Sequence, residues 1–170
     1  SLETSLDIIE GFRMPAGYVA SAFVTDDRRA AVKYETPLLL VTDERIDTVD
    51  QILPVLEVVA RDGRPLVIVA EEIEGQALAA LIMNTARGTM KIVAVKAPLY
   101  GEARKNMLSD LAISTGATFF TRDSRTKLKA AKLSDFGYCK SIDVTKTLTT
   151  VIGGAGDFEE VDKRIDILKG

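Results

Sequence analysis

Three acidic side chains stand close together after a short apolar run, where α/β enzymes often carry catalytic groups. Glu71, Glu72 and Glu74 follow the apolar run of residues 66–70. Three carboxylates within four residues could bind a divalent cation. However, Glu72 and Glu74 also precede a predicted helix, whose positive N-terminal end favours acidic residues. The sequence favours this helix-start interpretation, so no metal site is expected.

Lys96 is the second candidate for chemistry. It ends the apolar run of residues 92–95, and a lysine in that position could form a Schiff base or bind phosphate. A salt bridge or an exposed position at the rim is the simpler interpretation. With Glu71 and Glu72, Lys96 defines one alternative function, a small α/β enzyme or ligand-binding domain that uses side chains at strand ends.

The third candidate is a glycine-rich segment, GGAGD at residues 153–157, in front of a predicted helix. It resembles a phosphate cradle but lacks the lysine and the Ser or Thr of a P-loop, and it lacks the spacing of a dinucleotide fingerprint. We therefore interpret it as a flexible exit from a hairpin. No cofactor-binding residue is expected in this chain.

Histidine is absent from the 170 residues, and Cys139 is the only cysteine. Within this chain these counts exclude Ser-His-Asp and Cys-His catalysis and a zinc site of the usual ligands. They also exclude an internal disulfide, which fits a reducing compartment. No catalytic residue is predicted, and cytoplasmic localisation is expected.

Composition limits the function classes further. A chain of 170 residues, 46% apolar and 28% charged, is long enough for one globular domain with a sizeable core. The formal net charge of −3 gives no reason to expect nucleic acid. No apolar run approaches the roughly 20 residues of a membrane span, and the acidic N-terminus lacks a signal-peptide core. Neither nucleic acid nor membrane is an expected partner.

The elements that would position these residues alternate regularly after residue 38. Continuous apolar runs predict buried strands, and 3.6-residue periodicity predicts helices between them. This alternation predicts an α/β fold with a central mostly parallel sheet, flanking helices and short antiparallel strands. Residues 11–17 are expected to be a loop because of their Gly and Pro. The expected strands are 31–35, 38–41, 66–70, 92–95, 118–120, 138–144 and 148–152, and the expected helices are 49–61, 76–87, 102–115 and 158–168, with a short helix and loop over 126–136.

Helices 49–61 and 76–87 carry apolar side chains on two faces, whereas a surface helix normally has one apolar face. Packing alone favours burial of both faces within the domain. The alternative is an exposed groove, a kind of surface that can take an apolar segment of a partner. Asn84, among the apolar residues of the second helix, could bind a partner's backbone or form a hydrogen bond within the domain.

Long ordered stretches of the chain resemble the apical domain of group I, GroEL-type (60 kDa) chaperonins. The resemblance covers roughly residues 5–157. It rests on LDIIEGF (6–12), on PVLEVVARDGRPLVIVAEEIEGQALAALIMNTARG (54–88), on KIVAVKAP (91–98) and GEARKNMLSDLA (101–112), and on LSDFG (133–137) and KTLTTVIGGAGD (146–157). Ala22, where the family usually has an aromatic residue, and Asp26 with Asp27, where it often has a lysine, mark a divergent member.

The resemblance implies a three-layer β/β/α domain at the mouth of a seven-subunit ring. Such a domain binds apolar segments of non-native proteins and the mobile loop of a co-chaperonin. The site residues implied, together with Asn84, are Leu53 and Leu56 on the first helix, Leu78, Ile82 and Met83 on the second, and Tyr18 and Phe23 on an underlying segment. Glutamate in place of Leu56 or Ile82 is expected to abolish client capture and leave the domain folded.

The family's ATP site lies in another domain, so this chain is not expected to be an enzyme. ATP and Mg are expected only in the full-length, ATP-driven ring. The predicted organisation is a hinge-side segment at residues 1–9, the apical domain at 10–157, and a C-terminal helix at 158–170 that leads back toward the intermediate domain.

Overall fold

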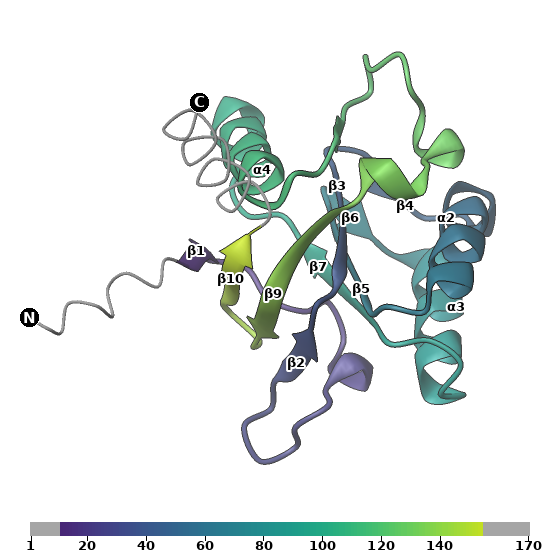
Figure 1. Cartoon of the computed structure of the whole chain (residues 1–170), viewed down its shortest axis with the longest axis vertical. Helices are drawn as coiled ribbons and strands as arrows, with labels where there is room; N and C mark the ends of the chain where they lie inside the picture. Colours follow the sequence, from purple (N-terminus) through teal and green to yellow (C-terminus); the bar gives the residue numbers. More distant parts are fainter. Residues whose placement is uncertain (1–10, 155–170) are drawn as a thin grey trace, which may run out of the picture.

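The computed structural model describes residues 11–154 of the chain (Figure 1). The predicted hinge-side segment, the predicted C-terminal helix and residues 155–157 of the glycine-rich segment lie outside this range. The strands are β1 (Gly11–Met14), β2 (Val32–Glu35), β3 (Leu38–Thr42), β4 (Arg45–Ile46), β5 (Leu66–Ala70), β6 (Glu72–Ile73), β7 (Ile92–Lys96), β8 (Phe119–Phe120), β9 (Gly137–Val144) and β10 (Thr149–Gly154). The helices are α2 (Val49–Asp62), α3 (Gly75–Ala86) and α4 (Gly101–Thr115), with single 3-10 turns η1 (Ser21–Phe23), η2 (Leu128–Ala130) and η3 (Leu133–Asp135).

The centre of the fold is a parallel set of strands. β3 pairs with β5 and β5 pairs with β7, in both cases in parallel, while β8 pairs in parallel with the other edge of β3. Every residue of β3 and β5 is buried, which explains their continuous apolar sequences, since a parallel strand is covered on both faces.

A second set of strands is antiparallel. β1 pairs with β10, β10 with β9, and β2 with the same β9. β9 also pairs with the start of β3, which joins both sets into one eight-stranded sheet. The predicted fold class, α/β with a central mostly parallel sheet, flanking helices and short antiparallel strands, is confirmed.

The three helices lie on two sides of the parallel strands. Figure 1 shows α2 and α3 next to each other on one side and α4 on the other. α2 begins after Thr48, whose backbone N–H donates to Gln51 Oε1 at 3.0 Å, a contact typical of a capping box. It ends at Gly63, which has a φ of 91° and donates its N–H to Val59 O, because glycine adopts this left-handed conformation without steric cost.

Two predictions about elements are wrong. Residues 11–14 form β1 instead of a loop, because they pair with β10. This pairing cannot be predicted from the local sequence, since β10 lies far away along the chain. Gly153 and Gly154 belong to β10 instead of a flexible exit, and Gly154 pairs with Cys139 of β9. Within residues 126–136 the structure has the short 3-10 helices η2 and η3, which agrees with the short helix and loop expected there.

Cys139 is fully buried in β9, and this burial raises the pKa of its thiol to about 12. Because the thiolate is the reactive form, the thiol is expected to be inert in the folded protein. We predict that an Ellman-type disulfide reagent at pH 8 labels the native protein at least about a hundredfold more slowly than the urea-unfolded chain. Equal labelling rates would show that Cys139 is accessible.

Candidate functional site

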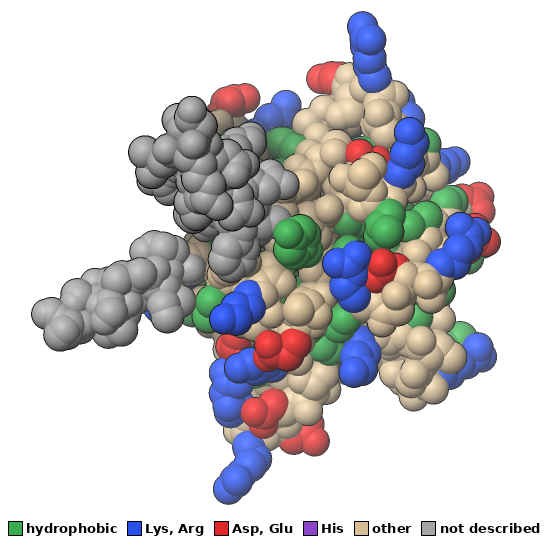
Figure 2. Space-filling model, viewed as in Figure 1, with side chains coloured by type: hydrophobic (Ala, Val, Ile, Leu, Met, Phe, Trp, Pro, Cys, Tyr) green, Lys and Arg blue, Asp and Glu red, His purple; other side chains and the backbone are tan. Residues whose placement is uncertain are grey.

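The α2–α3 surface consists of four apolar side chains, Leu53 on α2 and Leu78, Ile82 and Met83 on α3. Leu53 is 46% exposed and Met83 51% exposed, which is unusual for large apolar residues. Leu78 and Ile82 are half-buried and pack against the core. Figure 2 shows apolar side chains among charged ones on the side where Figure 1 places α2 and α3. The predicted second apolar face therefore exists and is partly open to solvent.

Two predicted surface residues are instead in the core. Leu56 is only 6% exposed, and its side chain joins Ile52, Val55 and Val59 on the inner face of α2. Phe23 is 0% exposed and ends η1, which packs against α3 and β7. The expectation that these two side chains are available to a partner is wrong, because the core needs them to fill the space beneath the helices.

The segment beneath α3 is held by its backbone. Tyr18 forms an antiparallel bridge with Val95 of β7. Val19 donates its N–H to Ala94 O at 2.9 Å, and the half-buried Tyr18 donates its hydroxyl to Ala30 O at 3.0 Å. These bonds place the segment along the outer edge of β7, which protects that edge from pairing with other chains. Tyr18 is thus fixed along the edge of β7.

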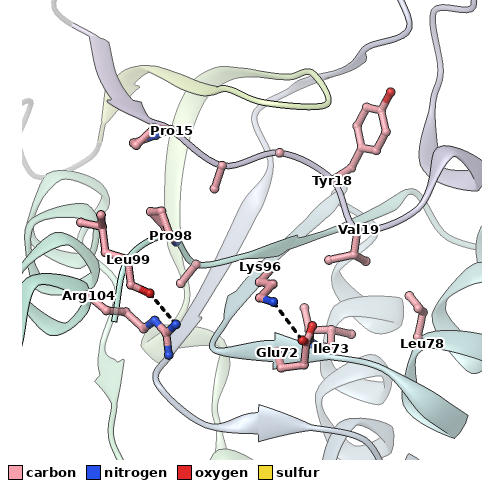
Figure 3. A pocket seen from close by; sticks show the side chains of 13 residues that line it. Pro15, Tyr18, Val19, Glu72, Ile73, Leu78, Lys96, Pro98, Leu99 and Arg104 are labelled. Atoms are coloured by element: carbon pink, nitrogen blue, oxygen red, sulfur yellow. Dashed lines mark hydrogen bonds and ion pairs between the residues drawn. The ribbon is translucent and has the colours of Figure 1, made fainter. Parts of the chain in front are cut away.

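A cavity of about 600 Å³ opens between this segment, α3 and the end of β7 (Figure 3). Tyr18 and Leu78 both line it, so it is continuous with the α2–α3 surface. Its walls combine apolar side chains with three charged ones, Glu72, Lys96 and Arg104. The Nζ atom of Lys96 lies 3.2 Å from Oε2 of Glu72. A cavity with this mixed lining offers both apolar contact and polar groups to a ligand.

Asn84 forms hydrogen bonds within the domain. Its side-chain amide donates to Ala80 O at 2.9 Å, and its carbonyl oxygen lies 3.4 Å from Thr89 Oγ1. Of the two roles considered for Asn84, binding a partner's backbone or a hydrogen bond within the domain, the structure shows the hydrogen bond within the domain. A partner could reach Asn84 only in competition with these bonds.

The strand-end residues of the alternative enzyme do not form one site. Glu72 pairs with Lys96 in the cavity described above, whereas the neighbouring Glu71 faces a second cleft and lies within 4 Å of three arginines. Those distances are 2.9 Å to Arg122, 3.6 Å to Arg104 and 3.8 Å to Arg45. In the part of the chain that the structure describes, no cluster of three possible metal ligands is found. The geometry thus gives little support to strand-end catalysis.

Glu74 occupies the cap position in front of α3, but its carboxylate makes no capping hydrogen bond. It instead forms an ion pair with Arg45. The prediction that Glu74 lies at the start of the helix is therefore correct. Its carboxylate, however, pairs with Arg45 and does not cap the backbone N–H groups of the helix.

Between residues 11 and 154, no helix is long and apolar enough to cross a membrane.

Among the known proteins that are similar to this chain are two of the same kind. The chain is 45% identical over 163 residues to the chaperonin GroEL of Acholeplasma laidlawii, covering 96% of this chain. It is 41% identical over 170 residues, all of this chain, to the mitochondrial heat shock protein 60 of Saccharomyces cerevisiae. The chain spans about 30% of the length of each relative. No family model matches the chain. These identities show that the chain is homologous, over almost its whole length, to one segment of GroEL-type chaperonins.

Proposed function

We propose that this chain is the apical domain of a chaperonin and that it holds non-native polypeptides on the α2–α3 surface without nucleotide. The observation that carries the proposal is the exposure of Leu53 and Met83 on neighbouring helices of a chaperonin homologue. Large apolar side chains that remain exposed next to a cavity often mark a binding surface. Methionine is unbranched and adaptable, which suits partners of varied sequence.

Binding by one domain should be weak. Full burial of one large apolar side chain is worth about 1.5 to 3 kcal/mol, and these side chains are already partly buried. Association entropy cancels much of the remaining gain. We therefore expect micromolar or weaker affinity for a single chain, raised by avidity in a ring of several copies. Because apolar burial has no directional preference, selectivity among client sequences should be low.

The rest of the proposal concerns the longer protein. Residues 10–157 form the client-binding domain, residues 1–9 and 158–170 connect it to the next domain, and a cytoplasmic ring homo-oligomer binds ATP and Mg elsewhere. The mobile loop of a co-chaperonin competes with clients for the α2–α3 surface. This chain alone neither binds nor hydrolyses ATP. The 41–45% identity to two chaperonins supports the assignment of a client-binding domain in a ring-forming chaperonin.

A capture assay tests the function. A denatured, aggregation-prone protein is diluted into buffer with the chain in molar excess, without nucleotide, and light scattering is followed. We expect the chain to lower the scattering in a concentration-dependent manner, since captured segments cannot aggregate. Unchanged scattering would contradict the proposal. Stabilisation in a thermal melt by a metal or small ligand, without capture, would favour the strand-end enzyme, and self-association without capture would favour an oligomerisation module.

A further inference from the structure

Leu99 lies in the short turn between β7 and α4, and its backbone conformation is unusual. Its φ is 66°, in the left-handed region that glycine adopts without steric cost and that leucine rarely adopts. Its side chain is also 48% exposed. Glycine or asparagine would suit this position better on both counts. Stability of the fold therefore does not explain a leucine here, and such an outlier is a reason to look for a function of the side chain.

The turn is held in this conformation by Arg104 of α4. The Nη2 group of Arg104 donates a hydrogen bond to the backbone oxygen of Leu99 (Figure 3). The side chain of Arg104 is only 17% exposed, and its Nη1 atom lies 3.6 Å from Oε2 of Glu71. Because Arg104 is itself fixed in this way, the turn is rigid. Leu99 therefore loses little conformational freedom when a partner binds to it, which lowers the free-energy cost of binding.

Leu99 shares a cavity with the α2–α3 surface. Leu99 and Leu78 both line the cavity of about 600 Å³ described above. Figure 3 shows these two leucines on opposite sides of the cavity, with the ion pair of Lys96 and Glu72 between them. Since Leu78 belongs to the α2–α3 surface, that surface and Leu99 are joined by one open cavity whose middle carries charged groups.

A single exposed leucine is common on protein surfaces and needs no explanation by itself. Leu99 differs because its backbone is strained, its turn is rigid and its cavity leads to an apolar surface. We propose that Leu99 is a second anchor for clients held on the α2–α3 surface, and that the cavity takes the stretch of client between the two anchors. The inference rests on the proposed function, since the α2–α3 surface is the first anchor.

This arrangement defines the class of client segment that binds best. It has two apolar groups, one for the α2–α3 surface and one for Leu99. The residues between the two groups are small or polar, because the middle of the cavity carries the Lys96–Glu72 ion pair, and an apolar side chain there would bury charged groups without a partner. A segment with one apolar group gains only the contacts of the α2–α3 surface.

Two fluorescently labelled peptides test the inference by anisotropy, with the full chain and without nucleotide. The two-group peptide has two apolar groups joined by a serine–glycine stretch, whose length is varied to find the tightest binder. The one-group peptide is identical except that serines replace the second apolar group. We expect the wild type to bind the two-group peptide about fivefold more tightly, because a half-exposed leucine gains further apolar burial from a partner.

The variants are Leu99→Asn and Leu99→Gly. Both residues suit a left-handed backbone, so neither variant is expected to unfold the domain. Each should lower the preference for the two-group peptide to less than about twofold and leave the affinity for the one-group peptide unchanged. Leu133→Asn is the matched control, because Leu133 is 43% exposed and does not line this cavity. It should retain the preference of the wild type.

The outcomes separate this inference from the proposed function. If the wild type binds both peptides equally, or if the preference survives Leu99→Asn, the second anchor is overturned while capture on the α2–α3 surface stands. If the wild type binds neither peptide, the proposed function and the second anchor are both overturned. Sedimentation velocity covers the remaining occupant, a second copy of the chain. Self-association that Leu99→Asn abolishes, with peptide binding unchanged, would assign Leu99 to a contact between copies and overturn the inference.

Discussion

The double substitution Leu53→Asp with Met83→Asp is expected to lower the affinity for an amphipathic peptide by at least tenfold. The two side chains are about half exposed, so each still has roughly 1 kcal/mol of apolar burial to gain from a partner. Aspartate removes this gain and adds a charge that the partner would have to desolvate. Fluorescence anisotropy with a labelled peptide measures the change. Because neither side chain fills the core, the melting temperature should change by only a few degrees.

The chain contains a matched control for this result. Ile113 is 70% exposed. It belongs to α4, the helix on the other side of the parallel strands (Figure 1). Ile113→Asp makes the same kind of change at a surface outside the proposed site, so peptide affinity should stay within twofold of the wild type. If Ile113→Asp weakens binding as much as the double substitution, binding depends on general surface hydrophobicity instead of the α2–α3 surface.

The second large effect concerns stability. Leu56→Ala is expected to lower the free energy of unfolding by about 2 to 4 kcal/mol, because it removes a buried side chain and leaves a cavity. Leu53→Ala, three residues earlier on the same helix, should cost less than about 1 kcal/mol since Leu53 is half exposed. Urea denaturation followed by circular dichroism compares the two. Equal losses of unfolding free energy in the two variants would contradict the placement of Leu56 in the core and Leu53 at the surface.

The same burial changes the expectation for Leu56→Glu. The sequence predicts that this substitution abolishes capture in a folded domain. A glutamate at a position 6% exposed would bring a charge into the core, which is strongly unfavourable. We now expect the variant to unfold, so loss of capture in Leu56→Glu would not identify a binding residue.

The parallel core of the fold could be predicted because its strands leave a strong local signal. β3, β5 and β7 are continuous apolar runs, and α2 and α4 end at Gly63 and Gly116, both with positive φ. The strands β1, β4 and β6 could not be predicted. They are two to four residues long, and each exists because a segment distant in sequence supplies its hydrogen bonds.

Only part of the α2–α3 surface could be predicted from the sequence, and the reason is geometric. Leu53 and Leu56 are three positions apart and so lie only about 60° apart around a helix. Periodicity assigns both to one outer face, but a small rotation of α2 on the sheet decides which of them is buried. Phe23 presents the same difficulty, since the depth of η1 depends on contacts with α3 and β7.

The most direct test of client binding on the α2–α3 surface is a peptide titration of the ¹⁵N-labelled chain. An amphipathic peptide is added in steps, without nucleotide, and the shifted amide resonances are placed on the structure. The account predicts saturable shifts at Leu53, Leu78, Ile82 and Met83, extending to Tyr18 in the adjoining cavity. Saturable shifts confined to other surfaces, or no saturable shifts at any peptide concentration, would contradict it.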